Sequence, residues 1–143
     1  MCGLAGVLKI TSDASLGGLA RSMAEALVHR GPDDGDVWCD TVAGIALAHR
    51  RLSILDLSPT GHQPMISPSG RYVLAFNGEI YNHADIRREL DTRGNSVWRG
   101  RSDTETLLTA CEAFGVRGAL TRCVGMFAFA LWDKVEHALF LAR

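Results

Sequence analysis

The chain has 143 residues, of which 47% are hydrophobic and 22% charged, and its formal net charge is −1 at pH 7. This length suffices for one domain with a hydrophobic core, and the balanced charge excludes a nucleic-acid-binding or membrane-surface protein. Lys9 ends the first apolar run too early for a secretory signal, and no run reaches the ~18 apolar residues of a membrane span. A cytoplasmic protein with reduced cysteines is therefore expected.

The first part of the chain predicts a strand, a helix and two more strands. The apolar run 2–10 is typical of a strand buried on both faces. A helix is expected at about 14–29, where apolar residues recur at helical spacing, and the Gly-Pro pair at 31–32 ends it. The apolar stripe of this helix consists of Leu16, Leu19, Ala20, Met23 and Leu27. Strands are then expected at 36–40 and within 43–57.

A loop and a further strand and helix follow. The prolines and glycines of 58–70 predict a loop, and 71–81 is the next expected strand. Asn82 is expected to cap a helix over 83–93, which a glycine closes.

The last part predicts two helices and a hairpin. Ser102 and Glu105 form a capping-box pattern, so a helix is expected to begin there and to end at Gly115. A short helix is expected around 117–122. The apolar segments 125–133 and 137–143 predict a hairpin of core strands, and the chain stops while still in strand pattern, which indicates one domain of a longer protein.

Most of these strands are apolar on both faces and therefore need cover on both sides. Two packed sheets with helices outside provide that cover, and so do helices on both faces of one sheet. Periodicity alone does not choose between the two arrangements.

Cys2 is the first candidate for chemistry. Taken alone, it is most simply a small buried apolar residue at an arbitrary position. Removal of Met1, however, would leave a thiol and a free α-amine on one residue, and an α-amine has a pKa of ~7.7–8.0. A base suited to neutral pH would then stand beside a strong nucleophile.

Other side chains supply what such a nucleophile needs. Asn77 and Gly78 follow an apolar strand and are either a hairpin turn or an oxyanion hole. Of Arg50 and Arg51, one is expected to face solvent, while the other either forms a surface pair or is held inside to bind a carboxylate. Asp103, in the first turn of a helix, either complements the helix dipole or binds an ammonium group.

Six segments in this order resemble the glutaminase domain of glutamine-hydrolysing asparagine synthetases, a class II amidotransferase with an amino-terminal nucleophile. They are "MCGLAG", "HRGPDDGD", "LAHRRLSILDLSPTGHQPM", "FNGEIYNH", "RSDTETLL" and "GMFAFALWD". The resemblance covers essentially the whole chain. It implies an α+β fold over residues 1–143: a four-layer αββα sandwich of two packed, mainly antiparallel sheets with helices outside.

The resemblance also implies roles for single residues. Cys2, exposed by loss of Met1, would attack the side-chain amide of glutamine with its own α-amine as the base. Asn77 and Gly78 would hold the oxyanion, and Arg51 would grip the α-carboxylate. The other implied substrate contacts are the segment Leu52, Ser53, Ile54 and Leu55, and the acids Glu79 and Asp103, which would receive the α-ammonium. The five histidines are expected in loops or at helix ends, with no catalytic role.

Family members join this domain to an ATP-dependent synthetase domain that uses the ammonia to amidate an aspartyl-adenylate. No P-loop or pyrophosphate-loop motif occurs here, so ATP and magnesium are expected only for that absent domain, and no cofactor or metal for this one. L-glutamine and the C-terminal synthetase domain are the expected partners, nucleic acid and membrane are not, and a homodimer is left open. The alternatives are a relative that amidates or cyclises another acid, and a non-catalytic glutamine-binding domain if Met1 is retained.

Overall fold

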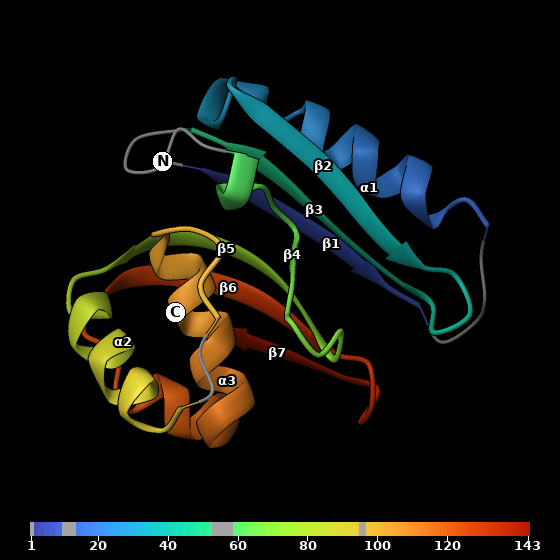
Figure 1. Cartoon of the computed structure of the whole chain (residues 1–143). Coiled ribbons are helices and arrows are strands. Elements are labelled where there is room, and N and C mark those ends of the chain that lie inside the picture. Colours follow the sequence, from blue (N-terminus) through green and yellow to red (C-terminus); the bar gives the residue numbers. More distant parts are fainter. Residues whose placement is uncertain (1, 10–13, 53–58, 95–96) are drawn as a thin grey trace.

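Two antiparallel sheets pack face to face, and each carries helices on its outer side (Figure 1). The computed structural model describes residues 2–9, 14–52, 59–94 and 97–143. One sheet has the strand order β1-β3-β2 and the other β4-β5-β6-β7. The elements are β1 (Gly3–Leu8), α1 (Leu16–Glu25), η1 (Val28–Arg30), β2 (Asp34–Asp40), β3 (Ile45–Arg51), η2 (Pro59–Gly61), β4 (Met65–Ile66), β5 (Tyr72–Ile80), α2 (His83–Thr92), α3 (Asp103–Leu120), β6 (Gly125–Asp133) and β7 (Ala138–Ala142).

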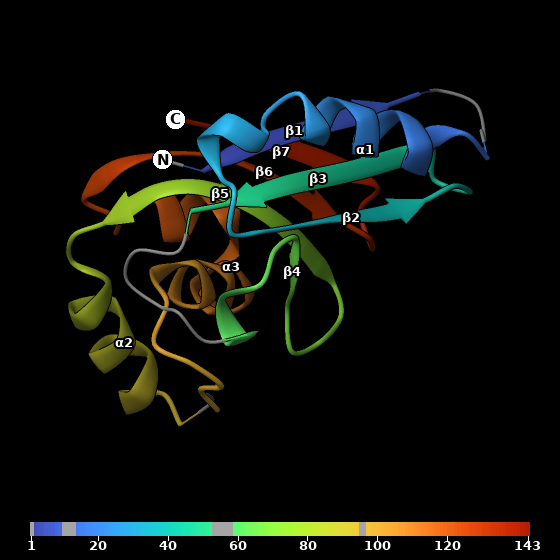
Figure 2. The same ribbon diagram turned by 90° about the horizontal axis from the view of Figure 1, so that it is seen from above.

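Alternation along β3 explains why two sheets form. Ala46 and Ala48 face α1 and form the floor of the small outer core. Ile45 and Leu47 point the other way, into the layer between the sheets, where Trp132 of β6 also packs. A strand that is apolar on both faces is thus covered by a helix on one side and a second sheet on the other. The expected αββα sandwich is confirmed, and Figure 2 shows its layers from another direction.

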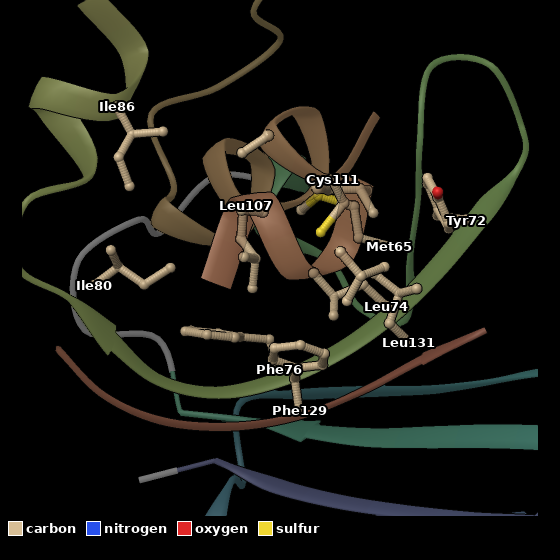
Figure 3. Close-up of a cluster of buried hydrophobic side chains, with 14 of the residues drawn as sticks. Met65, Tyr72, Leu74, Phe76, Ile80, Ile86, Leu107, Cys111, Phe129 and Leu131 are labelled. Carbon is tan, nitrogen blue, oxygen red and sulfur yellow. The ribbon is translucent and has the colours of Figure 1, made fainter. Parts of the chain in front are cut away.

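The largest core lies between the second sheet and helices α2 and α3. Inward-facing side chains of β5 alternate along the strand and pack against α3, as Figure 3 shows for Leu74, Phe76 and Ile80. Leu107 and Cys111 contribute from α3. Burial of apolar area of this kind is the main source of stability, and it anchors β5 firmly on its α3 side.

The first helix is shorter than expected. α1 ends at Glu25, and the following residues form the separate 3-10 turn η1. Its buried side is Leu16, Ala20 and Ala24, whereas two members of the expected stripe, Leu19 and Met23, are 43% and 38% exposed. α1 packs on a three-stranded sheet whose facing side chains include the small Ala46 and Ala48, so only a narrow stripe of the helix surface is buried.

Two local expectations in the middle of the chain are wrong. The expected loop 58–70 contains the short strand β4, which pairs Met65 with Leu74 of β5. Asn82 stands at the amino end of α2 but does not cap it; its side chain donates to the carbonyl of Arg122 and accepts from the N–H of Val124. The Asn82 side chain therefore forms tertiary hydrogen bonds instead of capping α2. The expected strand residues at 53–57 lie outside the described residues.

The start of α3 agrees with the capping-box pattern at Ser102, whereas the Glu105 side chain is bonded elsewhere. Ser102 is the N-cap and accepts a hydrogen bond from the N–H of Glu105 at 3.2 Å. The Glu105 carboxylate receives the N–H groups of Arg99 and Gly100 and pairs with Arg87. Gly115 interrupts the helix with a φ of 71°, where the sequence predicted an end. No helix in the described part of the chain is long and apolar enough to cross a membrane.

His49 contradicts the expectation that every histidine lies in a loop or at a helix end. It is a fully buried residue of β3, and its Nε2 lies 2.9 Å from the carbonyl oxygen of Phe76 in the opposite sheet. Burial lowers the pKa of His49 from 6.5 to about 4, against the opposing effect of the bond to Phe76. The ring is therefore neutral at pH 7 and acts there as an N–H donor.

This burial predicts a pH dependence of stability. In the unfolded chain His49 takes up a proton below 6.5, whereas in the folded chain it does so only near 4. The folded state is therefore destabilised as pH falls through that window, by about 2 kcal/mol between pH 7 and pH 4.5. We expect the free energy of unfolding of the parent protein to fall by this amount more than that of His49→Gln, measured by denaturant titration at both pH values.

The exposed His29 provides the matched control, because His29→Gln should follow the parent protein at both pH values. Equal losses of stability in His49→Gln and the parent would contradict the prediction.

Candidate active site

The site lies along the edge of β5 beyond its short pairing with β4. β4 pairs only with Val73 and Leu74, and none of the residues that the structure describes continues this pairing along the edge. The N–H of Phe76 instead donates to Oε1 of Gln63 at 2.6 Å, and its carbonyl accepts from His49. Side chains thus replace a strand along this edge.

Another side chain bonds the same edge of β5 at Ile80, four residues after Phe76. The N–H of Ile80 donates to Oδ2 of Asp103 at 2.9 Å. N–H groups of alternate residues point to the same edge of a strand, so the N–H of Gly78 lies between these two held positions. The segment from Asn77 to Glu79 therefore borders a space rather than another strand.

That space is a cavity of about 470 Å³. It is lined by Cys2, Arg51, Leu52, Gly61, Gln63, Phe76, Asn77, Gly78, Glu79, Tyr81, His83, Arg101, Ser102, Asp103, Thr104 and Met126. Every predicted site residue that the structure describes is in this set, drawn from four separate parts of the chain. Ser53, Ile54 and Leu55 lie outside the described residues.

Cys2 is placed at the cavity by the pairing of β1 with β3. Gly3 pairs with Arg50, so Cys2 lies beside the end of β3. Its Sγ is 3.4 Å from the N–H nitrogen of Leu52 and 3.8 Å from the carbonyl oxygen of the same residue. Arg30 donates from Nε to the Cys2 carbonyl at 3.1 Å and fixes the main chain next to the thiol. The half-buried thiol thus has a defined position.

The two neighbouring arginines point to opposite faces of β3. Arg51 is 8% exposed and lines the cavity, and its guanidinium lies so close to Gly61 that a Cβ there would collide with it. Arg50 points to the other face of β3 and donates to the carbonyl of Gly31. A guanidinium held at a cavity wall is suited to bidentate binding of a carboxylate.

Asn77 and Gly78 present hydrogen-bond donors to the cavity. No described residue hydrogen-bonds the Asn77 side chain, whose Oδ1 is buried. Gly78 has a φ of 145°, and a Cβ at this position would collide with the main chain at Met126 and Phe127. Only glycine permits this approach of β5 to β6. Asn77 and Gly78 lie within β5, so they do not form a simple hairpin turn.

The acidic side of the cavity is formed by Asp103 and Glu79. Asp103, the first residue of α3, is 8% exposed and accepts from the N–H groups of Ile80 and Thr104. Those two bonds orient the carboxylate while its remaining lone pairs stay available to a ligand. Glu79 is exposed at the cavity mouth. An ammonium group would find two acids in this lining, which also includes Arg51.

Sequence reasoning missed several residues that this site uses. Arg30 and Gln63 stood within the quoted motifs but had no role assigned, because neither local pattern shows what the side chain contacts. His83 also lines the cavity, at the start of α2. His62, by contrast, forms exposed pairs with Asp34 and Asp36 of β2.

Comparison with known proteins identifies the family. The model of the glutamine amidotransferase domain matches residues 1–143. Asparagine synthetase [glutamine-hydrolyzing] 2 of Bacillus subtilis is 38% identical over 146 residues, covering 100% of this chain and 19% of that protein. Asparagine synthetase B [glutamine-hydrolyzing] of Escherichia coli is 38% identical over 144 residues, covering 100% of this chain and 25% of that protein.

A solved structure supports the fold. The chain superposes on glutamine phosphoribosylpyrophosphate amidotransferase from B. subtilis, complexed with ADP and GMP, with a TM-score of 0.75 and 16% identity. The match covers 97% of this chain and 36% of that one. The chain thus spans about a quarter or less of the curated relatives' length and about a third of this structure's. From its sequence, its fold and its cavity, this chain belongs to the glutamine amidotransferase domain family.

Proposed function

We propose that this domain hydrolyses L-glutamine to glutamate and ammonia, with Cys2 as the nucleophile. The observation that carries the proposal is one cavity that brings together a positioned thiol, the Arg51 guanidinium, two acids and the Asn77-Gly78 segment. The α-carboxylate of glutamine would pair with Arg51 and its α-ammonium with Asp103 and Glu79. Gripping both charged groups at one end of the substrate directs the side-chain amide toward the thiol.

The first half of the reaction forms a thioester. Once Met1 is removed, the α-amine of Cys2 takes the thiol proton, and Sγ forms a bond to the amide carbon of glutamine. The carbonyl electron pair moves to oxygen, and Asn77 Nδ2 and the Gly78 N–H donate to the resulting oxyanion. The tetrahedral intermediate collapses, the C–N bond breaks, and the nitrogen leaves as ammonia with the proton held by the amine.

The second half releases glutamate. Water loses a proton to the α-amine and attacks the thioester carbon, where the same donors hold the second oxyanion. The C–S bond then breaks, the sulfur recovers its proton, and glutamate leaves. The Leu52 N–H, 3.4 Å from Sγ, is placed to donate to the sulfur while it carries negative charge.

We propose further that the ammonia serves an ATP-dependent synthetase domain that makes asparagine. The support is the identity of the relatives, which are glutamine-hydrolysing asparagine synthetases about four to five times longer than the aligned region. The ATP and magnesium requirement of that domain, a homodimer and a cytoplasmic location stay predictions. So does the absence of a cofactor from the glutaminase reaction itself.

Replacing the thiol tests the nucleophile. Cys2→Ala should reduce glutamate release from glutamine to background, because no other group in the cavity can form the thioester. Cys39→Ala is the matched control and should keep the parent rate, since that exposed cysteine of β2 is not part of the cavity lining. Glutamate release by Cys2→Ala at the parent rate would refute the mechanism.

Activity should also depend on the free α-amine of Cys2. We expect the rate of glutamate release to scale with the fraction of chains that lack Met1, measured by intact mass on the same samples, since an amide nitrogen cannot act as the base. Full activity in a sample that retains Met1 throughout would contradict the assignment of the amine.

Removing the guanidinium tests the carboxylate site. Arg51→Ala should raise the KM for glutamine by a factor that corresponds to about 2–5 kcal/mol, the usual loss when a buried charge pair is broken. Arg50→Ala, on the opposite face of β3, should leave KM within about 3-fold of the parent value, well under 1 kcal/mol. An unchanged KM in Arg51→Ala would remove Arg51 from the pocket.

A further inference from the structure

Two side chains from different parts of the chain hydrogen-bond the main chain of Phe76, the residue just before the proposed oxyanion donors. Gln63 accepts from the Phe76 N–H at 2.6 Å, and His49 lies 2.9 Å from the Phe76 carbonyl oxygen. Both side chains are buried, at 5% and 0% exposure. We call this pair the Phe76 clamp.

The clamp is needed because no strand among the described residues pairs with this edge of β5 at Phe76. Pairing with β4 stops at Leu74, two residues earlier. The Phe76 ring is buried in the large core on the α3 side (Figure 3), so its main chain is held by packing on one side and by the clamp at the edge. A buried peptide group without these partners would lack hydrogen bonds altogether, and the strand would shift to find them.

Gln63 also ties this segment to the start of α3. Its Nε2 donates to Oγ1 of Thr104 at 3.4 Å. The neighbouring Asp103 holds the N–H of Ile80, at the other end of the cavity-facing segment. Residues 77–79 are therefore bracketed at both ends by side chains that are linked to one another.

We propose that Gln63 and His49 are positioning residues for the oxyanion hole, acting through the main chain of Phe76. This inference rests on the proposed glutaminase function. The clamp orients the peptide that leads directly into Asn77 and Gly78, so it sets where their donors point. Oxyanion donors act on charge that develops only in the transition state, and the substrate's charged end is bound elsewhere, at Arg51 and Asp103.

Because the oxyanion donors and the groups that bind the substrate's charged end are different residues, variants of the clamp should change kcat and leave KM nearly unchanged. Gln63→Met keeps the length of the side chain but removes the acceptor, and His49→Leu removes the donor. Each should lower kcat for glutamine hydrolysis by about 10-fold to 100-fold, at most the loss caused by removing an oxyanion donor itself. KM for glutamine and the inhibition constant of glutamate should both stay within about 3-fold, because ground-state binding is unchanged.

His49→Gln is the conservative variant that separates positioning from packing. A glutamine amide places an N–H near the position of the imidazole Nε2, so kcat should return to within about 3-fold of the parent, which a purely volumetric role would not produce. The double variant Gln63→Met/His49→Leu should lose less than the product of the single losses, because both changes release the main chain of the same residue, Phe76.

Several results would overturn the proposal. One is a parental kcat in both Gln63→Met and His49→Leu, and another is a raised KM with kcat unchanged, which would make Gln63 a direct substrate contact. A third is equal kcat loss in His49→Gln and His49→Leu. If Gln63→Met fails to fold, as monitored by thermal denaturation, the His49 pair decides alone. Failure of the proposed function itself is distinguishable, because the parent protein and Cys2→Ala would then release glutamate equally.

Discussion

The edge of β5 beyond its pairing with β4, which no described strand covers, is the constraint on which the site depends. A β-sheet edge inside a folded protein leaves main-chain N–H and carbonyl groups that must find partners. Here β4 covers only the first part of the edge, and the side chains of Gln63, His49 and Asp103 hold it further on at Phe76 and Ile80. Gly78, between these two held residues, borders the cavity.

The layer between the sheets changes character along β3. Ile45 and Leu47 belong to the apolar packing between the sheets, whereas His49 and Arg51, on the same face of the same strand, are polar and still buried. Buried polar groups need hydrogen bonds or a ligand. His49 finds its partner in the opposite sheet, and the Arg51 side chain lies at the cavity wall.

Strand register connects these features to the amino terminus. The antiparallel pairing of β1 with β3 sets Gly3 against Arg50, and this brings Cys2 to the polar end of β3. Arg30 donates a hydrogen bond to the Cys2 carbonyl. The main-chain N–H and carbonyl of Leu52 both contact the Cys2 sulfur. A shift of the register by one residue would turn every side chain of β1 to the other face and carry the thiol away from the cavity.

Much of the fold could be predicted from local pattern, because strand alternation, the Ser102 cap and the Gly115 break are properties of short segments. The exceptions are segments whose partners are distant in sequence. Asn82 has an ideal capping side chain but uses it on the segment between α3 and β6. α1 buries a narrower stripe than its periodicity predicts because of what it packs against. Local propensity is overridden wherever a tertiary contact offers more.

The sequence by itself determined the residue types of the site and the chemistry they permit: a thiol at position 2, an arginine at 51, an amide and a glycine at 77 and 78, and an acid at 103. Only the tertiary structure decided that these residues share one cavity, and that Gln63 and His49 hold the strand behind it. The physical reason is that hydrogen bonding along a sheet edge joins residues by register and packing, which depend on segments far apart in the chain. No short pattern around Gln63 or His49 shows that both side chains bind the main chain of the same residue.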